Sequence, residues 1–470
     1  MADETTTKAN AAQPNTVGRR TFIKAAAAAA ATAAVGVPWI WVPGRATAQT
    51  AGFGTIKHLL YIRLSGGFRF TAAFNADVAA EFNPFGLASR KAEGAEWGVS
   101  ALLERDGWRS EELQALGVQT VPDIAGDIAV LPCVDHEPLA AYADGNHGSG
   151  LERYLTGYVG GDTGLFTMIN YGLRDRAAQA LADGVTLLPA FVLGNSGMAL
   201  GAGKYAAHRA PVLSGDGFDQ FGFDASANLP DWAQEMADAR DERVHGKVHT
   251  RYKDAIEAYQ LTRESTKAYA EIFNSDTLKI ASNGDAVIDG ISNDELAAVL
   301  GNSRAARNIR LAMRLFHFGS PAVYLDQGGY DMHSGEEASL PGRFDDLNRL
   351  IAGLHYVLRK MTHPSGGSYW DHTVVAFGSE FGRTARGDEF NSARGSDHGG
   401  DLATRWMSMP FMGGPIKAGG RSLGATRPAD LKALGEVYSY RATFKTLMDG
   451  LGADTSEFFP GDEPFDILYL

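Results

Sequence analysis

Asp331 and His333 lie two positions apart in a glycine-containing segment that follows the apolar run Ala322–Asp326. A carboxylate oxygen and an imidazole nitrogen are both good ligands for zinc or manganese, and an extended or turning loop lets such a pair reach one ion. An Asp-x-His pair on its own is more often a hydrogen-bonded loop pair. The spacing makes both residues candidate metal ligands and leaves the loop-pair interpretation open.

A second group of ionisable residues follows the apolar run Thr373–Phe377. Glu380 and Arg383 come directly after it, and Asp397 and His398 lie in a glycine-flanked loop further on. Glycine lets such a loop approach a neighbouring segment closely. Each residue also has a structural interpretation: an ion pair between Glu380 and Arg383, a turn at Asp397, a surface imidazole at His398. Their joint occurrence favours one functional site.

Short apolar runs between helical stretches predict the scaffold that positions these residues. They cover residues 57–64, 127–134, 322–326 and 373–377. Continuous apolar runs of this length are typical of strands buried on both faces. We therefore predict an α/β fold, a three-layer sandwich with a mostly parallel sheet between helices. Ligands of such sheets bind beyond the carboxyl ends of the strands, which is where the candidate residues lie.

The segment from Asp231 to Phe273 is polar and rich in Ala, Glu, Lys and Arg. It predicts one or two long surface helices, a helical insertion over about 229–275. No Ser/Pro-rich linker divides the rest of the chain, so one elaborated domain over 49–470 is expected.

Composition narrows the function classes. The 470 residues include 56 acidic and 43 basic side chains, a net charge of −13. This balance argues against nucleic acid as a partner, because phosphate neutralisation needs clustered Lys and Arg. Cys133 is the one cysteine, so an intrachain disulfide and a cysteine-rich zinc site are both excluded. Any metal must be held by histidine and carboxylate groups.

The first residues predict export. Thr16–Lys24 contains Arg19-Arg20, an apolar residue two positions on and a lysine, and so resembles the twin-arginine motif. The apolar run Ala25–Pro38 is shorter than the ~20 residues of a membrane span, and Ala46–Ala48 offers a small-residue cleavage site. We expect residues 1–48 to be a signal peptide, and the mature protein to be periplasmic or secreted without a transmembrane helix. A membrane anchor helix is the alternative.

Three motifs carry a resemblance to a known family. Residues 328–333 read Gly-Gly-Tyr-Asp-Met-His, residues 379–384 Ser-Glu-Phe-Gly-Arg-Thr, and residues 396–400 Ser-Asp-His-Gly-Gly. In order, spacing and strand context they resemble the motifs of the DUF1501 family, in the alkaline phosphatase/sulfatase superfamily. The resemblance implies a sheet of alkaline phosphatase-like type, and a twin-arginine leader is common in that family.

The resemblance also implies a metal site. The superfamily builds one site from an Asp and a His after a late strand and a His from a later loop, which implies Asp331, His333 and His398, with Asp397 beside them. Two of the three ligands of a second site are missing, because Ser65–Arg69 contains no carboxylate and Glu380 is followed by Phe. A single divalent metal is expected, zinc or manganese before calcium or magnesium. The other arrangement replaces an ion with a guanidinium.

The superfamily's nucleophile precedes a Thr-Gly pair at a helix N-terminus, and Thr156-Gly157 provides that frame. Counting back places His147 at the nucleophile position, with Ser149 two residues on. A helix N-terminus favours an anion, so this segment is suited to a phosphate or sulfate ester. The alternatives are a structural role for His147 and a capping box between Ser149 and Glu152.

Two classes of function follow. One is an exported metal-dependent hydrolase of a phosphate or sulfate ester, in which either His147 or a water activated by the ion attacks. The catalytic candidates are His147, Ser149, Glu380 and Arg383. The other is a catalytically degenerate envelope protein that keeps the fold and binds an anionic glycan or another partner. The missing second-site carboxylates favour the second class, and the retained ionisable residues favour the first.

Overall fold

The computed structural model describes residues 54–86, 96–137, 147–182, 188–213, 231–249, 287–288, 290–383, 391–392, 395–396, 405–417, 419–465 and 468–469. The predicted signal peptide, Asp397, His398 and most of the predicted helical insertion lie outside these residues. No helix in the described part of the chain is long and apolar enough to span a bilayer.

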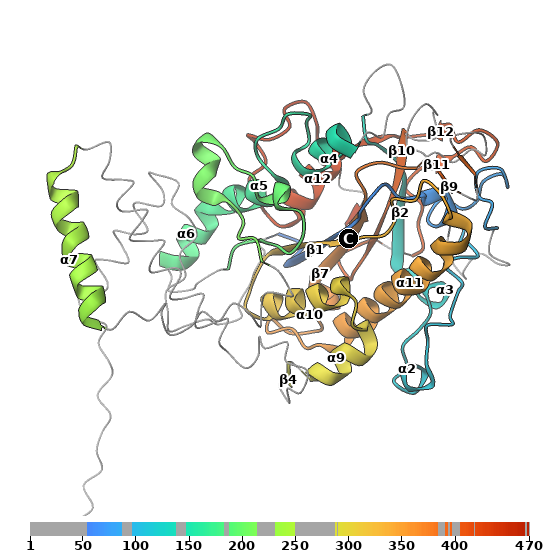
Figure 1. Ribbon diagram of the computed structural model, residues 1–470, viewed down its shortest axis with the longest axis horizontal. Helices are drawn as coiled ribbons and strands as arrows, with labels where there is room; N and C mark the ends of the chain where they lie inside the picture. Colours follow the sequence, from blue (N-terminus) through green and yellow to red (C-terminus); the bar gives the residue numbers. More distant parts are fainter. Residues whose placement is uncertain are drawn as a thin grey trace, which may run out of the picture.

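A seven-stranded sheet forms the centre of the molecule (Figure 1), in the order β13-β2-β10-β7-β1-β6-β3. Its strands are β1 (His58–Leu64), β2 (Ile128–Asp135), β3 (Phe191–Val192), β6 (Ala322–Gln327), β7 (Thr373–Gly378), β10 (Trp406–Met412) and β13 (Tyr438–Ser439). All neighbouring pairs are parallel except those of β10, which is antiparallel to both β2 and β7. The predicted α/β fold with a mostly parallel sheet is confirmed.

The reversed strand β10 was not predicted from the sequence. Its pairing with β2 shifts register between Met407 and Met409, so that Ser408 faces a two-residue stretch containing Pro132. Because proline cannot donate to a sheet ladder, the irregularity accommodates Pro132 within an interior strand. Pro410 and the methionine-rich composition of β10 obscure its strand pattern in the sequence.

Helices cover both faces of the sheet. Figure 1 shows α4 (His147–Thr156), α5 (Leu165–Gly172) and α12 (Tyr440–Gly450) on one side, and α9 (Asn293–Leu300), α10 (Arg304–His317) and α11 (Glu336–Lys360) on the other. Ser292, Ser303 and Ser439 cap α9, α10 and α12 by accepting a backbone N–H of the first turn.

Shorter elements complete the described chain. The remaining helices are α2 (Glu111–Ala115), α3 (Val121–Ile124), α6 (Arg174–Ala182) and α7 (Asp231–Lys247), with 3₁₀ turns η1 (Phe70–Ala72), η2 (Ala125–Asp127), η3 (Ser196–Ala199), η4 (Gly203–His208) and η7 (Trp370–His372). Two-residue strands pair as β4 (Val287–Ile288) with β5 (Ile291–Ser292), β8 (Asn391–Ser392) with β9 (Gly395–Ser396), and β11 (Ala425–Thr426) with β12 (Ala433–Leu434).

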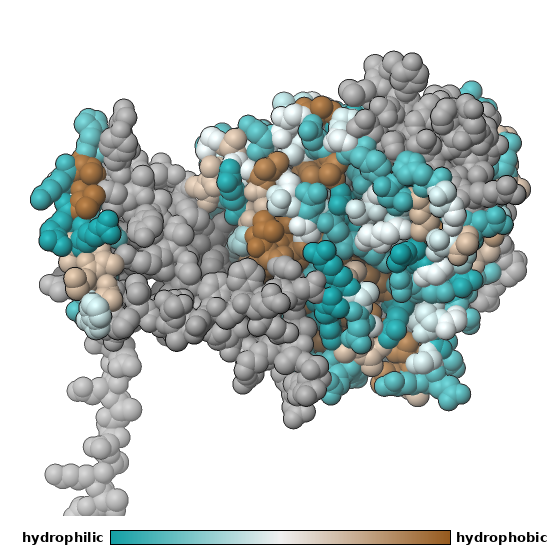
Figure 2. Space-filling view, in the orientation of Figure 1, coloured by the Kyte–Doolittle hydropathy of each residue, from teal (hydrophilic) through white to brown (hydrophobic). Residues whose placement is uncertain are grey.

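Helix α7 lies within the range of the predicted helical insertion, and Figure 1 draws it apart from the layers around the sheet. Trp232 and Met236 on this helix are both 65% exposed. Figure 2 shows apolar surface on α7, whereas the sheet domain is mostly hydrophilic or mixed on the same face.

Candidate metal centre and active site

The candidate site lies at the carboxyl end of β1, between its two neighbours. In the sheet register, Arg63 of β1 is level with Asp326 of β6 on one side and with Gly378 of β7 on the other. Asp331 follows β6 and Glu380 follows β7, so both carboxylates reach the same edge of the sheet. The strand order therefore brings together two segments about fifty residues apart in the chain.

His147, Asp331 and His333 form a compact group of metal-ligating side chains. Their ligand atoms all lie within 4.8 Å of one another. The Nε2 atom of His147 is 3.3 Å from Asp331 Oδ1, and the Nε2 atom of His333 is 3.0 Å from the same oxygen. The three side chains are 40%, 51% and 51% exposed, so the group opens to solvent.

These separations fit a zinc site or another small divalent ion. Metal–ligand bonds of about 2.0–2.1 Å at tetrahedral angles place ligand atoms about 3.3 Å apart. Two imidazoles and one carboxylate are also the donor set expected for zinc or manganese. The sequence placed Asp331 and His333 in one metal site. His398, the third predicted ligand, and its neighbour Asp397 lie outside the described residues, and His147 stands beside the pair.

Arg383 binds the carboxylate at the centre of this group. Its Nη2 donates a hydrogen bond to Asp331 Oδ1 and another, of 2.7 Å, to the carbonyl oxygen of Gly66. Partial burial on its own raises the pKa of the Asp331 carboxyl, but the hydrogen bond and charge of Arg383 outweigh it and hold that pKa below its ordinary value. Asp331 is therefore ionised and ready to bind a cation at neutral pH.

Glu380 is buried behind the group, where it contacts Gly66 and Arg63. Its Oε1 accepts a 2.8 Å hydrogen bond from the Gly66 N–H, and its Oε2 lies 3.8 Å from Arg63 Nη1. Its Oε1 is also 4.0 Å from His147 Nδ1. This separation is too long for a direct hydrogen bond, so the carboxylate contributes a negative charge behind the imidazole.

Arg63 and Asp326 are functional candidates that sequence reasoning missed. The side chain of Arg63 is only 7% exposed, and its Nε donates a 2.7 Å hydrogen bond to Asp326 Oδ1. The Tyr324 hydroxyl donates to the same oxygen. The sequence did contain a signal for this site, because Arg63 is the one charged residue in the apolar run 59–64. This buried guanidinium, held between Asp326 and Glu380, fits the expectation that an arginine replaces a second ion.

Two glycines after β1 allow the segments to meet. Gly66 and Gly67 have φ values of +113° and +81°, which disfavour other residues. A Cβ atom on Gly66 would lie 2.5 Å from the Asp331 backbone nitrogen, and one on Gly67 would lie 2.0 Å from the Phe381 ring. Because Gly66 has no side chain, its N–H can donate a hydrogen bond to Glu380 while its carbonyl oxygen accepts one from Arg383.

Helix α4 brings His147 to the site from the other side. His147 is the first residue of α4, and its ring centroid lies 5.0 Å from that of Phe381. Ser149 is half-buried inside the first turn, so the predicted N-cap role of Ser149 is wrong. Glu152 does not complete a capping box, because its Oε2 accepts a 2.9 Å hydrogen bond from the Gly160 N–H.

A buried ion pair fixes the loop that carries Asp331 and His333. Arg69 Nη2 donates a 2.9 Å hydrogen bond to Glu336 Oε2, and both side chains are at most 2% exposed. Arg69 follows β1, and Glu336 is the first residue of α11, three residues after His333. The pair therefore joins both ends of the site and adds a carboxylate at a helix N-terminus.

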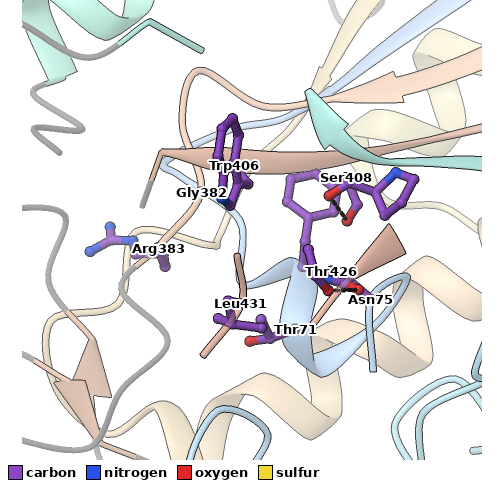
Figure 3. A pocket seen from close by; sticks show the side chains of 10 residues that line it. Thr71, Asn75, Gly382, Arg383, Trp406, Ser408, Thr426 and Leu431 are labelled. Carbon is purple, nitrogen blue, oxygen red and sulfur yellow. Dashed lines mark hydrogen bonds between the residues drawn. The ribbon is translucent and has the colours of Figure 1, made fainter. Parts of the chain in front are cut away.

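A small cavity adjoins Arg383 on the side away from the metal-ligating group. Its volume is about 20 Å³, enough for about one water molecule. Figure 3 shows the guanidinium of Arg383 pointing away from the other lining residues, which include Asn75, Thr426 and Trp406. This cavity is too small to hold an organic substrate.

Comparisons with known proteins identify the family. A search of curated proteins finds no match to the chain. The integral membrane protein lipooligosaccharide phosphoethanolamine transferase A from Neisseria meningitidis is similar in structure with 11% sequence identity and a TM-score of 0.31. That match covers 92% of this chain and 61% of the other.

One family model matches residues 104–467, which is most of the chain and includes Asp331, His333, Glu380 and Arg383. The family is described as "Protein of unknown function (DUF1501)". The chain belongs to the DUF1501 family.

Proposed function

We propose that this protein is an exported, metal-dependent hydrolase of a phosphate or sulfate ester. The observation that carries the proposal is the group His147, Asp331 and His333, which combines two imidazoles and one carboxylate at the sheet edge. Alkaline phosphatase-like chemistry, implied by the sequence motifs, is in keeping with this donor set.

In this proposal His147, Asp331 and His333 hold one divalent metal, zinc or manganese. We assign His147 to metal binding because its Nε2 and that of His333 approach the same oxygen of Asp331. A bound divalent ion supplies Lewis-acid polarisation of a phosphoryl or sulfuryl oxygen.

The other residues orient the ligands and bind charge. Glu380 lies behind His147, with its Oε1 4.0 Å from Nδ1, and places a negative charge beside that imidazole. Arg383 and the N-terminal turn of α4 provide positive potential for the anionic ester group. Ser149 in that turn is a candidate donor to an ester oxygen. In hydrolysis, a water oxygen bonds to phosphorus or sulfur, the ester bond breaks, and the departing alkoxide takes up a proton.

Hydrolysis of activated aryl phosphates and sulfates tests the proposal. The purified protein is assayed with Zn, Mn, Mg or Ca supplied. We expect turnover that falls ~10²-fold or more in His147→Ala, a loss of ~2.7 kcal/mol of transition-state stabilisation. His249→Ala, which removes another exposed imidazole, is the matched control and should retain activity. If the rates stay at background with every metal and ester, the hydrolase proposal is rejected and the non-catalytic envelope protein is the remaining proposal.

Export is tested separately. The twin-arginine pathway reads guanidinium geometry and not charge alone. We expect the Arg19→Lys, Arg20→Lys variant to accumulate as precursor in the cytoplasm, with periplasmic protein seen for the wild type by fractionation. Normal export of the variant would assign the leader to another pathway or to a membrane anchor.

A further inference from the structure

His147 reaches the metal-ligating group from a different element than its two partners. It is the first residue of α4, whereas Asp331 and His333 share the loop after β6. Glu380 Oε1, 4.0 Å from His147 Nδ1, is too distant for a direct hydrogen bond. Among the described residues, the ring of Phe381 lies nearest to this imidazole, with 5.0 Å between centroids, against 6.4 Å for His333. Phe381 is therefore the aromatic residue best placed to set the orientation of the ligand.

The ring of Phe381 is itself held in place. The residue is fully buried, and its ring rests on Gly67, where a Cβ atom would lie 2.0 Å from Cε2. Its carbonyl oxygen accepts a 3.1 Å hydrogen bond from the Phe68 N–H, and the Arg383 N–H donates to the carbonyl oxygen of Phe68 at 3.2 Å. These bonds form a parallel bridge between Phe68 and Gly382, which ties the segment after β7 to the segment after β1. A ring fixed in this way presents a rigid surface to its neighbours.

Two residues of the site contact that surface. The imidazole of His147 stands at 68° to the ring, the edge-to-face arrangement that aromatic pairs prefer. The guanidinium carbon of Arg383 lies 5.8 Å from the ring centroid, within the range of a cation–π contact. Arg383 in turn binds the carboxylate of Asp331. One ring thus contacts a metal-ligating side chain and the residue that holds a second one.

We propose that Phe381 is a positioning residue, whose ring orients the His147 imidazole toward Asp331 before an ion binds. The inference rests on the proposed metal site. A ligand already in its binding orientation loses less conformational freedom when the ion arrives, so the ring raises metal affinity without touching the metal. Leucine or methionine fills part of the same space but has no flat, rigid face. If Phe381 only filled space in the core, its replacement would lower stability and leave metal affinity unchanged.

Metal affinity measures the proposed role directly. The full-length protein is freed of metal, and Zn²⁺ binding is measured by competition with a chelator. We expect Phe381→Leu to weaken the affinity about tenfold or more, the usual effect of removing a residue that orients a metal ligand. Phe377→Leu is the matched control, because it removes a ring that is 1% exposed, four residues earlier in β7, and it should keep the wild-type affinity.

The visible absorption spectrum of bound Co²⁺ provides a second readout, because it depends on the geometry of the ligands. We expect the bands of Phe381→Leu to differ in position and intensity from those of the wild type, and the bands of Phe377→Leu to match the wild type. A loss of stability alone does not alter this spectrum. Either an unchanged affinity or an unchanged spectrum in Phe381→Leu would overturn the proposal, and so would an equal loss of affinity in Phe377→Leu.

Phe381→Met covers the case in which Phe381→Leu does not fold. Methionine is flexible and fills irregular spaces in a core, so this variant should fold, and urea unfolding checks that it does. It should bind Zn²⁺ more weakly than the wild type, because the rigid ring is absent. Wild-type affinity in Phe381→Met would contradict the positioning role.

Aryl ester hydrolysis by the wild type is measured in parallel, and separates this inference from the proposed reaction. If the wild type binds metal and hydrolyses esters while the Phe381 variants bind metal equally well, only this inference is rejected. If Phe381→Leu weakens metal binding and the wild type does not hydrolyse esters, only the reaction is rejected. A wild type that binds no ion rejects both.

Discussion

Histidines lie near both ends of β1, and the two groups differ in burial and in hydrogen-bond partners. At the amino end, His58 and His363 are 1% and 3% exposed, with their Nε2 atoms 3.0 Å apart. At the carboxyl end, His147 and His333 are half-exposed and surround the carboxylate of Asp331. The same side chain therefore meets an apolar interior at one end and an open acidic site at the other.

The hydrogen bonds at the amino end fix which nitrogen of each imidazole donates and which accepts. His58 Nδ1 lies 2.8 Å from the carbonyl oxygen of Ser320 and must donate to it, which leaves Nε2 as an acceptor. His363 Nδ1 accepts the Ser365 N–H at 3.1 Å, so its Nε2 donates to His58. Burial lowers the pKa of the His58 imidazole to about 3. We infer that this pair is structural.

At the carboxyl end the imidazoles have a carboxylate and solvent instead. The Nε2 atoms of His147 and His333 point to one oxygen of Asp331, a geometry that a cation satisfies and that a buried apolar core does not provide. Burial and the chemical partner, rather than the residue type, separate a structural histidine from a ligand. Each of the following predictions tests this difference.

The largest expected effect is on metal content. A His147→Ala, His333→Ala double variant should lose its metal, because a single carboxylate remains of the described donor set. A His249→Ala, His317→Ala double variant removes the same number of imidazoles elsewhere and should keep about one ion per chain. Elemental analysis of the purified protein measures both. Equal metal content in the two variants would place the ion away from His147 and His333.

The second effect is on stability, and here the amino end should dominate. His363→Ala leaves a cavity and an unpaired His58 Nε2, at a cost of about 2–4 kcal/mol. His333→Ala, at a half-exposed position, should change the free energy of unfolding of metal-free protein by about 0.5 kcal/mol or less. Urea unfolding gives both values. Similar losses at the two positions would contradict the distinction drawn between the two ends.

The third effect is a pH dependence at the amino end. The folded-state pKa of His58 lies near 3 and its ordinary value is 6.5, so the unfolded chain binds more protons between these values. The contribution of His58 to stability is thus complete above pH 6.5 and falls as the pH is lowered toward 3, by about 1.4 kcal/mol per pH unit.

Replacing the titrating group isolates this contribution. His58→Gln cannot titrate, so its free energy of unfolding should fall less steeply with acidity over the same window. Other buried histidines, such as His136, are present in both the wild type and the variant, so they contribute equally to the two profiles. Parallel profiles for wild type and variant would show that His58 does not titrate as burial requires.

The smallest effect is expected at Glu380. Its Oε1 is 4.0 Å from His147 Nδ1, too far for a direct hydrogen bond. We expect Glu380→Gln to weaken metal affinity about tenfold or less, because the amide still accepts the Gly66 N–H and the three ligands remain. Competition with a chelator measures the change. Complete loss of the metal would instead indicate that Glu380 is itself a ligand, and that the metal site includes the segment after β7.

Sequence patterns were sufficient for the elements with regular apolar runs. The runs 57–64, 127–134, 322–326 and 373–377 became β1, β2, β6 and β7 within a residue or two. Strand β10 was not predicted because Pro410 and its several methionines obscure the strand pattern. The cap expected at Ser149 failed because α4 begins two residues earlier, at His147, which puts Ser149 inside the first turn.

The sequence by itself determined the fold class, the family and the chemistry available, because apolar periodicity and residue type are local properties. Asp331, His333, Glu380 and Arg383 could be named from motifs alone. The pairing among them was decided only by the tertiary structure. Strand order puts Arg63 between Asp326 and Glu380, and Arg383 binds Asp331 instead. Which ionisable side chains pair depends on their distance in space. The strand order that sets those distances arises from packing of the whole sheet.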